Sequence, residues 1–156
     1  MKFFVGLHQP ADAAKLPDVP CMISIHRLER RRSDFKVGPW ILDSGAFTTI
    51  AQHGAYPASP AQYAEQINRW THCGELLAAV SQDYMCEPWI LERCHATVAE
   101  HQGLTILRYL ELRSRVPARI YVMPVIQGYA PAEYAHHVQA YGTLLAPNAW
   151  VGVGSV

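Results

Sequence analysis

Carboxylates and an amide end several apolar runs of this sequence. Asp43 stands inside "WILDSGAFTTI" (residues 40–50), directly after a run that is typical of a buried strand. Asp83 follows a second apolar run in "AVSQDYMCEP", and Gln127 follows a third in "PVIQG". Carboxylates accept hydrogen bonds or transfer protons, and an amide donates and accepts. Together these groups could recognise or react with a polar ligand, provided that the fold brings them together.

A fourth stretch, "VGVGSV" (151–156), adds Gly152 and Gly154, where the backbone can approach another group closely. Each residue also has a structural interpretation. Asp43 before Ser-Gly is typical of a turn, Asp83 could cap the short helical segment after it, Gln127 could be a loop residue, and the glycines could serve close packing. Their recurrence at the ends of successive apolar runs favours the functional interpretation.

Short apolar segments alternate with helical ones along the chain. We expect strands over residues 2–7, 19–25, 40–45, 75–83, 119–128 and 150–156. We expect helices over residues 59–74, 97–116 and 131–145. This alternation predicts an α/β fold with about six parallel strands, either a doubly wound sheet or a TIM-type (β/α)₈ barrel. No G-x-G-x-x-G follows the first strand, which disfavours a dinucleotide-binding sheet.

Two of the helices have recognisable starts. Ser59 with Gln62, and Thr97 with Glu100, have the spacing of capping boxes. The second helix also carries an apolar stripe at helical spacing, formed by Val98, Leu104, Leu107 and Leu110.

In parallel α/β folds, the carboxyl ends of neighbouring strands meet at one edge, where binding sites form. If consecutive strands are neighbours, the groups that end the third to sixth strands converge on one pocket. These residues are Asp43, Asp83, Gln127, Gly152, Gly154 and Ser155.

Composition limits the classes of function. The 156 residues are 50% hydrophobic and 17% charged, which is typical of one globular domain, here expected over 1–156. Lys plus Arg and Asp plus Glu both number 13, so no overall charge attracts nucleic acid or a membrane. No run approaches the roughly 18 apolar residues of a membrane span. The first residues lack the pattern of a secretory signal, so we expect no membrane contact and a cytoplasmic location.

The cysteines give little support to a metal site. There is no C-x-x-C, and the one conceivable cluster, Cys86, Cys94, His95 and His101, contains neighbours that point to different sides of a helix. We therefore expect buried, reduced cysteines and assign no metal ligands.

A basic run, "HRLERRR", lies between the second and third expected strands. Its arginines, Arg27, Arg30, Arg31 and Arg32, either contact nucleic-acid phosphates or form a solvated loop. The sequence leaves both interpretations open.

"ILDSGAF", "SQDYMCEPWIL", "PVIQG" and "VGVGSV", in this order, resemble the motifs of tRNA-guanine transglycosylases. They are more similar to those of the related DpdA family, the deazapurine DNA-modification proteins of bacteria and phages. The resemblance extends over nearly the whole chain. It implies a TIM-type barrel that exchanges a guanine base in DNA, or alternatively in tRNA, for a 7-deazaguanine. The target base must then leave its stack or come from a single strand.

The resemblance also implies roles for the residues. Asp43 would act at the glycosidic bond, and Asp83 would accept two hydrogen bonds from guanine. Gln127 and a backbone N–H of Gly154 or Gly152 would donate to the base carbonyl. The remaining base-binding residues would be Ser44 and, as stacking surfaces, Tyr84 and Met85.

Two departures shape the expectation. Ala46 stands where tRNA-acting enzymes have a second glycine. The resemblance places the nucleophilic aspartate and the zinc ligands of tRNA-acting relatives after residue 156. We therefore expect an incomplete barrel without a cofactor in this chain, holding the base-recognition half and completed by later residues or a partner chain. The alternatives are a non-catalytic base-binding remnant or subunit and, below it, a metal-dependent α/β hydrolase that uses Asp43 and Asp83.

Overall fold

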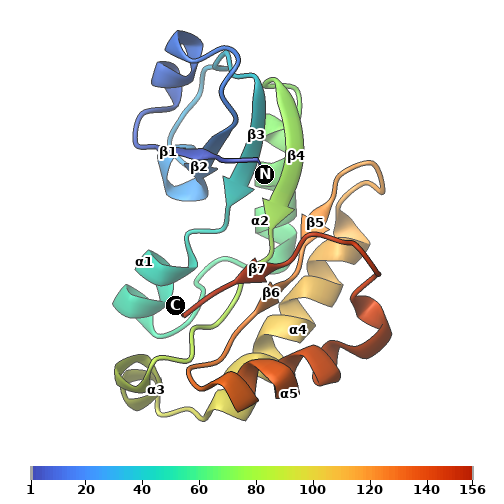
Figure 1. The fold of residues 1–156 in the computed structure, drawn as a ribbon. Helices are drawn as coiled ribbons and strands as arrows, with labels where there is room; N and C mark the ends of the chain where they lie inside the picture. Colours follow the sequence, from blue (N-terminus) through green and yellow to red (C-terminus); the bar gives the residue numbers. More distant parts are fainter. Residues whose placement is uncertain (1, 156) are drawn as a thin grey trace.

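A parallel sheet organises the fold. A computed structural model describes residues 2–155, and its first five strands are hydrogen-bonded in chain order. They are β1 (Val5–Leu7), β2 (Cys21–Ser24), β3 (Pro39–Asp43), β4 (Glu75–Val80) and β5 (Val122–Met123). A second parallel pair continues from β5, formed by β6 (Val125–Ile126) and β7 (Gly152–Val153) (Figure 1).

The order of the strands distinguishes between the two expected architectures. Each strand pairs with the next one along the chain, without the reversal that defines a doubly wound sheet. The predicted α/β fold with parallel strands is therefore confirmed, in a form consistent with an incomplete barrel. The strand predicted over residues 119–128 is divided at Pro124, which has no N–H to donate to a ladder. β5 pairs with β4 before this proline, and β6 pairs with β7 after it.

The helices fill the connections after β3. They are α1 (Ala46–His53), α2 (Pro60–Trp70), α3 (Pro88–Cys94), α4 (Val98–Arg115) and α5 (Pro131–Tyr141). Short 3₁₀ helices, η1 (Pro10–Lys15), η2 (Ile25–Arg27) and η3 (Gly142–Leu144), supply the other turns. In Figure 1, α2 lies behind β3 and β4, whereas α1 and α3 lie beyond the carboxyl ends of these strands. Among residues 2–155, no helix has the length and apolar character needed to cross a membrane.

Both predicted capping boxes are present. The Gln62 N–H donates to the Ser59 hydroxyl at 3.2 Å, and the Ser59 N–H donates to the Gln62 side chain at 2.8 Å. Thr97 and Glu100 make the same reciprocal pair at the start of α4. Two of the helix starts therefore follow from the sequence.

Successive side chains of the strands point to opposite faces of the sheet and pack into two apolar layers. Trp40 and Leu42 of β3 pack on the helices, together with Ile67 of α2 and Leu112 of α4. Ile41, between them, faces the opposite side of the sheet. It belongs there to a second cluster, formed with Ala78, Val80, Met123 and Val125. This alternation is the period of two expected of strands that are buried on both faces.

The helix predicted from the apolar stripe is present as α4, but the stripe does not form the buried face of this helix. Three of its members are exposed by 40% or more: Leu104, Leu107 and Leu110. The buried side chains of this helix are mostly polar or aromatic: His101, Gln102, Thr105, Tyr109 and Leu112. His101 contacts the Met85 carbonyl through Nδ1 at 2.5 Å, and the Thr105 hydroxyl accepts from the Tyr84 N–H at 2.9 Å. The buried face of α4 therefore combines hydrogen-bonded polar side chains with Tyr109 and Leu112 of the main apolar cluster.

Gly103 offers a test of the exposed face of α4. A Cβ added there would meet no atom within 4 Å, and alanine is the better helix former. We expect Gly103→Ala to raise the free energy of unfolding by about 0.5–1 kcal/mol, measured by urea denaturation. A loss of stability would show that the backbone at this position is not helical.

Candidate functional site

The alternation of side chains between the two faces of the sheet also places the polar residues that follow the strands. Asp43 follows the inward-facing Ile41 by two residues, and Gln127 follows Val125 in the same way. Ser24, at the end of β2, pairs in register with Asp43. The face of the sheet that carries Ile41 and Val125 therefore changes from apolar to polar at the carboxyl ends of the strands, as in sites built on parallel strands.

Asp83 and Gln127 are in direct contact at this edge. The Gln127 Nε2 donates to Asp83 Oδ2, and the Ser44 hydroxyl lies 3.4 Å from Asp83 Oδ1. The Asp83 side chain comes from the loop after β4, whereas Gln127 directly follows β6. Gln127 is fully buried and Asp83 is 6% exposed. The predicted convergence of these two residues is therefore present in the structure.

Tyr56 fixes the loop that carries Asp83. The Tyr56 hydroxyl donates to the Asp83 carbonyl at 3.0 Å and accepts from the Asp83 N–H at 3.1 Å. The N-cap of α3 is Glu87, so Asp83 does not cap this helix. The cap interpretation of Asp83 is therefore wrong, and its side chain is left to face Gln127 and Ser44.

Burial perturbs both aspartates. It raises the pKa of Asp83 from its ordinary value of 3.8 to about 7; the hydrogen bond from Gln127 opposes this shift, and the nearby charge of Asp43 adds to it. Burial also raises the pKa of Asp43, against hydrogen bonds from Gly45 and Ser24. Two buried carboxyl groups with mutual repulsion at one sheet edge are typical of a functional site.

Asp43 takes part in the turn that its sequence context suggested and also lines a cavity. Its Oδ2 accepts from the Gly45 N–H at 3.1 Å, which forms a turn before α1. Gly45 has the left-handed φ of +69° that this turn requires. The carboxylate also lines a cavity of about 390 Å³, together with Ser24, His26 and Arg27. The turn therefore holds Asp43 at an accessible position.

His26 is a site residue that our sequence analysis missed. Its Nε2 lies 3.1 Å from the Gly45 carbonyl and 3.1 Å from the Thr49 hydroxyl, and its Nδ1 lies 3.1 Å from Glu29. It lines both the cavity of Asp43 and a neighbouring cavity of about 620 Å³. His26 follows the carboxyl end of β2, so the strand-end argument would have found it if applied to the second strand.

Gly152 of β7 and Gly154, which follows this strand, act differently from the expectation. The Gly152 N–H donates to the Pro124 carbonyl at 2.9 Å, and the Gly154 N–H donates to the Ile126 carbonyl at 3.0 Å. Neither N–H is therefore free to reach a base in this structure. A Cβ on Gly154 would overlap the Gln127 amide, with its Cδ only 2.8 Å away. Gly154 thus provides space for Gln127.

Tyr84 and Met85 do not present open stacking surfaces. Both are at least 94% buried, in a cluster with Ile50, Tyr56 and Ile90. The Tyr84 ring lies 5.5 Å from that of Tyr56 in an edge-to-face arrangement. Tyr84 and Met85 instead anchor the loop that carries Asp83, because their side chains pack into this apolar cluster.

The basic run divides into two pairs. Arg27 lines the cavity of Asp43, and Arg30 lines the larger neighbouring cavity. Arg31 instead binds its own loop, donating to the Ser33 carbonyl at 2.7 Å and the Asp34 carbonyl at 3.1 Å. Arg32 is exposed and lines neither cavity. The first two arginines are thus the ones placed beside the site.

Comparison with known proteins gives the family. The sequence model of DpdA, described as "DeoxyPurine in DNA protein A", matches residues 1–156. This chain belongs to the DpdA family. Membership indicates a role in deazapurine modification of DNA. No curated protein and no solved structure matches the chain significantly.

Residues 2–155 of this DpdA chain contain one group of three potential metal ligands, and it lies outside the site. It consists of Asp34, His72 and Cys73. Asp34 already pairs with Arg69 at 2.8 Å and with His72 at 3.0 Å. The cluster conceived around Cys86, Cys94, His95 and His101 is not among such groups in the described residues. The cysteines at 21, 73, 86 and 94 are unbridged, and all but Cys94 are buried.

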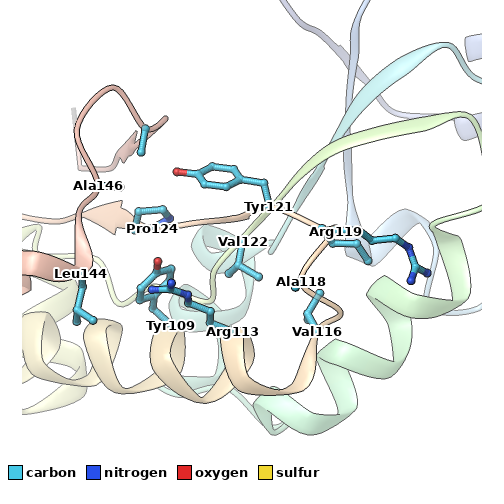
Figure 2. A pocket seen from close by; sticks show the side chains of 12 residues that line it. Tyr109, Arg113, Val116, Ala118, Arg119, Tyr121, Val122, Pro124, Leu144 and Ala146 are labelled. Carbon is cyan, nitrogen blue, oxygen red and sulfur yellow. The ribbon is translucent and has the colours of Figure 1, made fainter.

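A further cavity of about 390 Å³ lies at the amino end of β5. Figure 2 shows the Tyr109 ring and Arg113 rising from α4 beneath Tyr121 and Pro124, with the Arg119 side chain extending away. None of the predicted site residues lines this cavity. The candidate site described above is therefore separate from this cavity and lies at the carboxyl ends of the strands.

Proposed function

We propose that this chain recognises a guanine-like base through Asp83 and Gln127, in an exchange that inserts a 7-deazaguanine into DNA. The observation that carries the proposal is the buried contact between these two side chains. They come from separate strands and meet at the edge where parallel α/β folds bind ligands. The family assignment supports DNA as the target.

The chemistry of the two groups matches one edge of guanine. An ionised carboxylate has two acceptor oxygens, which suit the ring N–H and the exocyclic amine, and an amide N–H suits the carbonyl oxygen. In the described structure Gln127 donates to Asp83 itself, so each group satisfies the other in the absence of a base. A bound base would exchange this contact for its own hydrogen bonds. Ser44, beside Asp83 Oδ1, completes the set of polar groups.

We assign the proton transfer to Asp43. When the bond between the sugar and guanine breaks, its electrons leave with the base, and the carboxylate nucleophile that the family resemblance implies would bond to the sugar carbon; a proton from Asp43 would neutralise the departing base. The incoming deazaguanine would then displace that carboxylate from the sugar carbon and return its ring N–H proton to Asp43. A carboxyl group whose pKa is raised by burial is suited to this task. Arg27 and Arg30, at the adjoining cavities, would contact phosphates of DNA whose target base has left the stack.

The alternatives differ in what they require. A metal-dependent hydrolase would need further ligands beside Asp43 and Asp83, and the three-ligand group of the described residues lies elsewhere. A non-catalytic base-binding role would use the same pocket but would give Asp43 no task. Exchange of labelled guanine in DNA by this chain together with the residues or partner chain that supply the nucleophile, lost in Asp43→Asn, would distinguish exchange from binding alone.

The pH dependence of base binding tests the proposal. Because the pKa of Asp83 is about 7 and the ionised form accepts the hydrogen bonds, affinity should rise with pH. We expect calorimetric titration of guanine or 7-cyano-7-deazaguanine to give about tenfold tighter binding at pH 8 than at pH 6. Asp43→Asn should keep a rise but move it to lower pH, because Asp83 remains while the nearby charge that adds to its raised pKa is removed. Tighter binding at pH 6, or none at either pH by the folded chain, would refute the proposal.

A further inference from the structure

We infer that the Ser155 hydroxyl fixes the orientation of the Gln127 amide and so makes the site selective for a base with a carbonyl, rather than an amine, at position 6. This inference rests on the proposed function and extends it to specificity. The Ser155 hydroxyl donates to Gln127 Oε1 at 2.6 Å. Gln127 Nε2 then faces Asp83 and the site.

The geometry of the contact supports this direction of donation. A separation of 2.6 Å is in the range of O–H···O bonds and is short for N–H···O bonds, so Ser155 faces the oxygen of the amide. The ionised carboxylate of Asp83 only accepts hydrogen bonds and therefore requires the nitrogen on its side. The two partners thus select the same orientation from opposite ends of the amide.

Asp83 alone would not hold this orientation at neutral pH. Its pKa of about 7 means that the carboxyl group is partly protonated there, and a protonated carboxyl group can donate to an amide oxygen. Ser155 continues to donate to Oε1 whichever form Asp83 takes. The selective orientation therefore depends on Ser155 in the pH range where Asp83 titrates.

Ser155 is itself held by several elements. Its hydroxyl accepts from the Cys86 N–H at 3.1 Å. Glu87 Oε2, at 3.1 Å, competes with Gln127 Oε1, at 2.6 Å, for the single hydroxyl proton, and the shorter distance favours donation to Gln127. The Tyr134 hydroxyl of α5 lies 2.6 Å from the Ser155 carbonyl and 2.8 Å from that of Gly154. Ser155 also has a φ of +57°, which is unusual for a residue other than glycine. These contacts hold it in a conformation that positions its hydroxyl on Gln127.

Binding of two purines tests the inference. Guanine carries a carbonyl at position 6, whereas 2,6-diaminopurine carries an amine there and keeps the amine at position 2. We expect the wild-type chain to prefer guanine and Ser155→Ala to reduce this preference at least about fivefold, the value of one hydrogen bond. Ser155→Asn should keep the preference, because asparagine supplies a donor and tolerates a positive φ. Ser114→Ala, at an exposed serine of α4, is the matched control.

A second measurement needs no ligand. Hydrogen exchange of the Gln127 side-chain amide, identified by its loss in Gln127→Glu, should be at least about tenfold faster in Ser155→Ala than in the wild type. Equal weakening of both purines, or unchanged exchange, would overturn the inference. If the wild type binds neither purine, the proposed function fails, and the exchange rates alone decide whether Ser155 orients Gln127.

Discussion

Asp83→Asn is expected to weaken the binding of guanine or a 7-deazaguanine at least about a hundredfold. The carboxylate offers two acceptor oxygens, whereas asparagine replaces one of them with a donor that opposes the donors of the base. Hydrogen bonds to a charged group contribute about 1.5–3 kcal/mol each, so the loss of one and the mismatch at the other give a change of this size. Calorimetric titration at pH 8 measures it.

The same substitution should stabilise the fold at high pH. The folded state raises the pKa of Asp83 from an ordinary 3.8 to about 7, so it binds the proton more tightly than the unfolded chain. The contribution of Asp83 to stability is therefore full below pH 3.8 and is lost as the pH rises through 7. Relative to the wild type, Asp83→Asn should gain on the order of 2 kcal/mol in free energy of unfolding between pH 5 and pH 8.

Asp18→Asn is the control for both effects, because Asp18 is exposed and away from the site. It should change neither base binding nor the pH profile of unfolding. Two results for Asp83→Asn would contradict our description of the site. One is base affinity equal to that of the wild type, and the other is a change in stability that is the same at pH 5 and pH 8.

The strand-end argument predicted the centre of the site because it depends on backbone geometry. Side chains two residues apart in a strand share a face, and parallel strands end at one edge, so Asp43 and Gln127 followed from the apolar residues before them. Asp83 lies three residues beyond β4, and its placement depends on Tyr56, which binds both polar groups of its backbone. Spacing in the sequence does not predict that contact.

Other expectations were wrong for related reasons. The exposed stripe of α4 shows that apolar spacing does not predict a buried face when the residues that face the core are held by hydrogen bonds, as His101 and Thr105 are. The resemblance implies Tyr84 as a stacking surface for the base, whereas in the structure its ring packs edge-to-face against Tyr56. His26 was read only as part of a basic run, although it directly follows Ile25 at the end of β2.

The replacement of Gly154 by alanine should disturb the site, although this residue has no side chain that could contact a base. The added Cβ would overlap the nitrogen of the Gln127 amide and would lie 2.8 Å from its Cδ and 3.0 Å from its Oε1. Gln127 is fully buried, so the amide cannot move aside without losing its contacts to Asp83 and Ser155. We expect Gly154→Ala to cost about 2–3 kcal/mol of stability and to weaken base binding at least about tenfold.

A double-mutant cycle shows whether this loss of stability comes from the contact with Gln127 or from any added side chain at this end of β7. Gly6→Ala is the matched control, because a Cβ on this glycine of β1 would meet nothing within 4 Å, and it should change stability little. In a Gln127→Ala background the group that Gly154 accommodates is gone, so Gly154→Ala should then cost less than about 1 kcal/mol. Urea denaturation of the four proteins measures the coupling. An equal loss in both backgrounds would mean that the glycine serves the β6–β7 ladder itself, whereas a strong coupling would show that residue 154 is a glycine because Gln127 must reach Asp83.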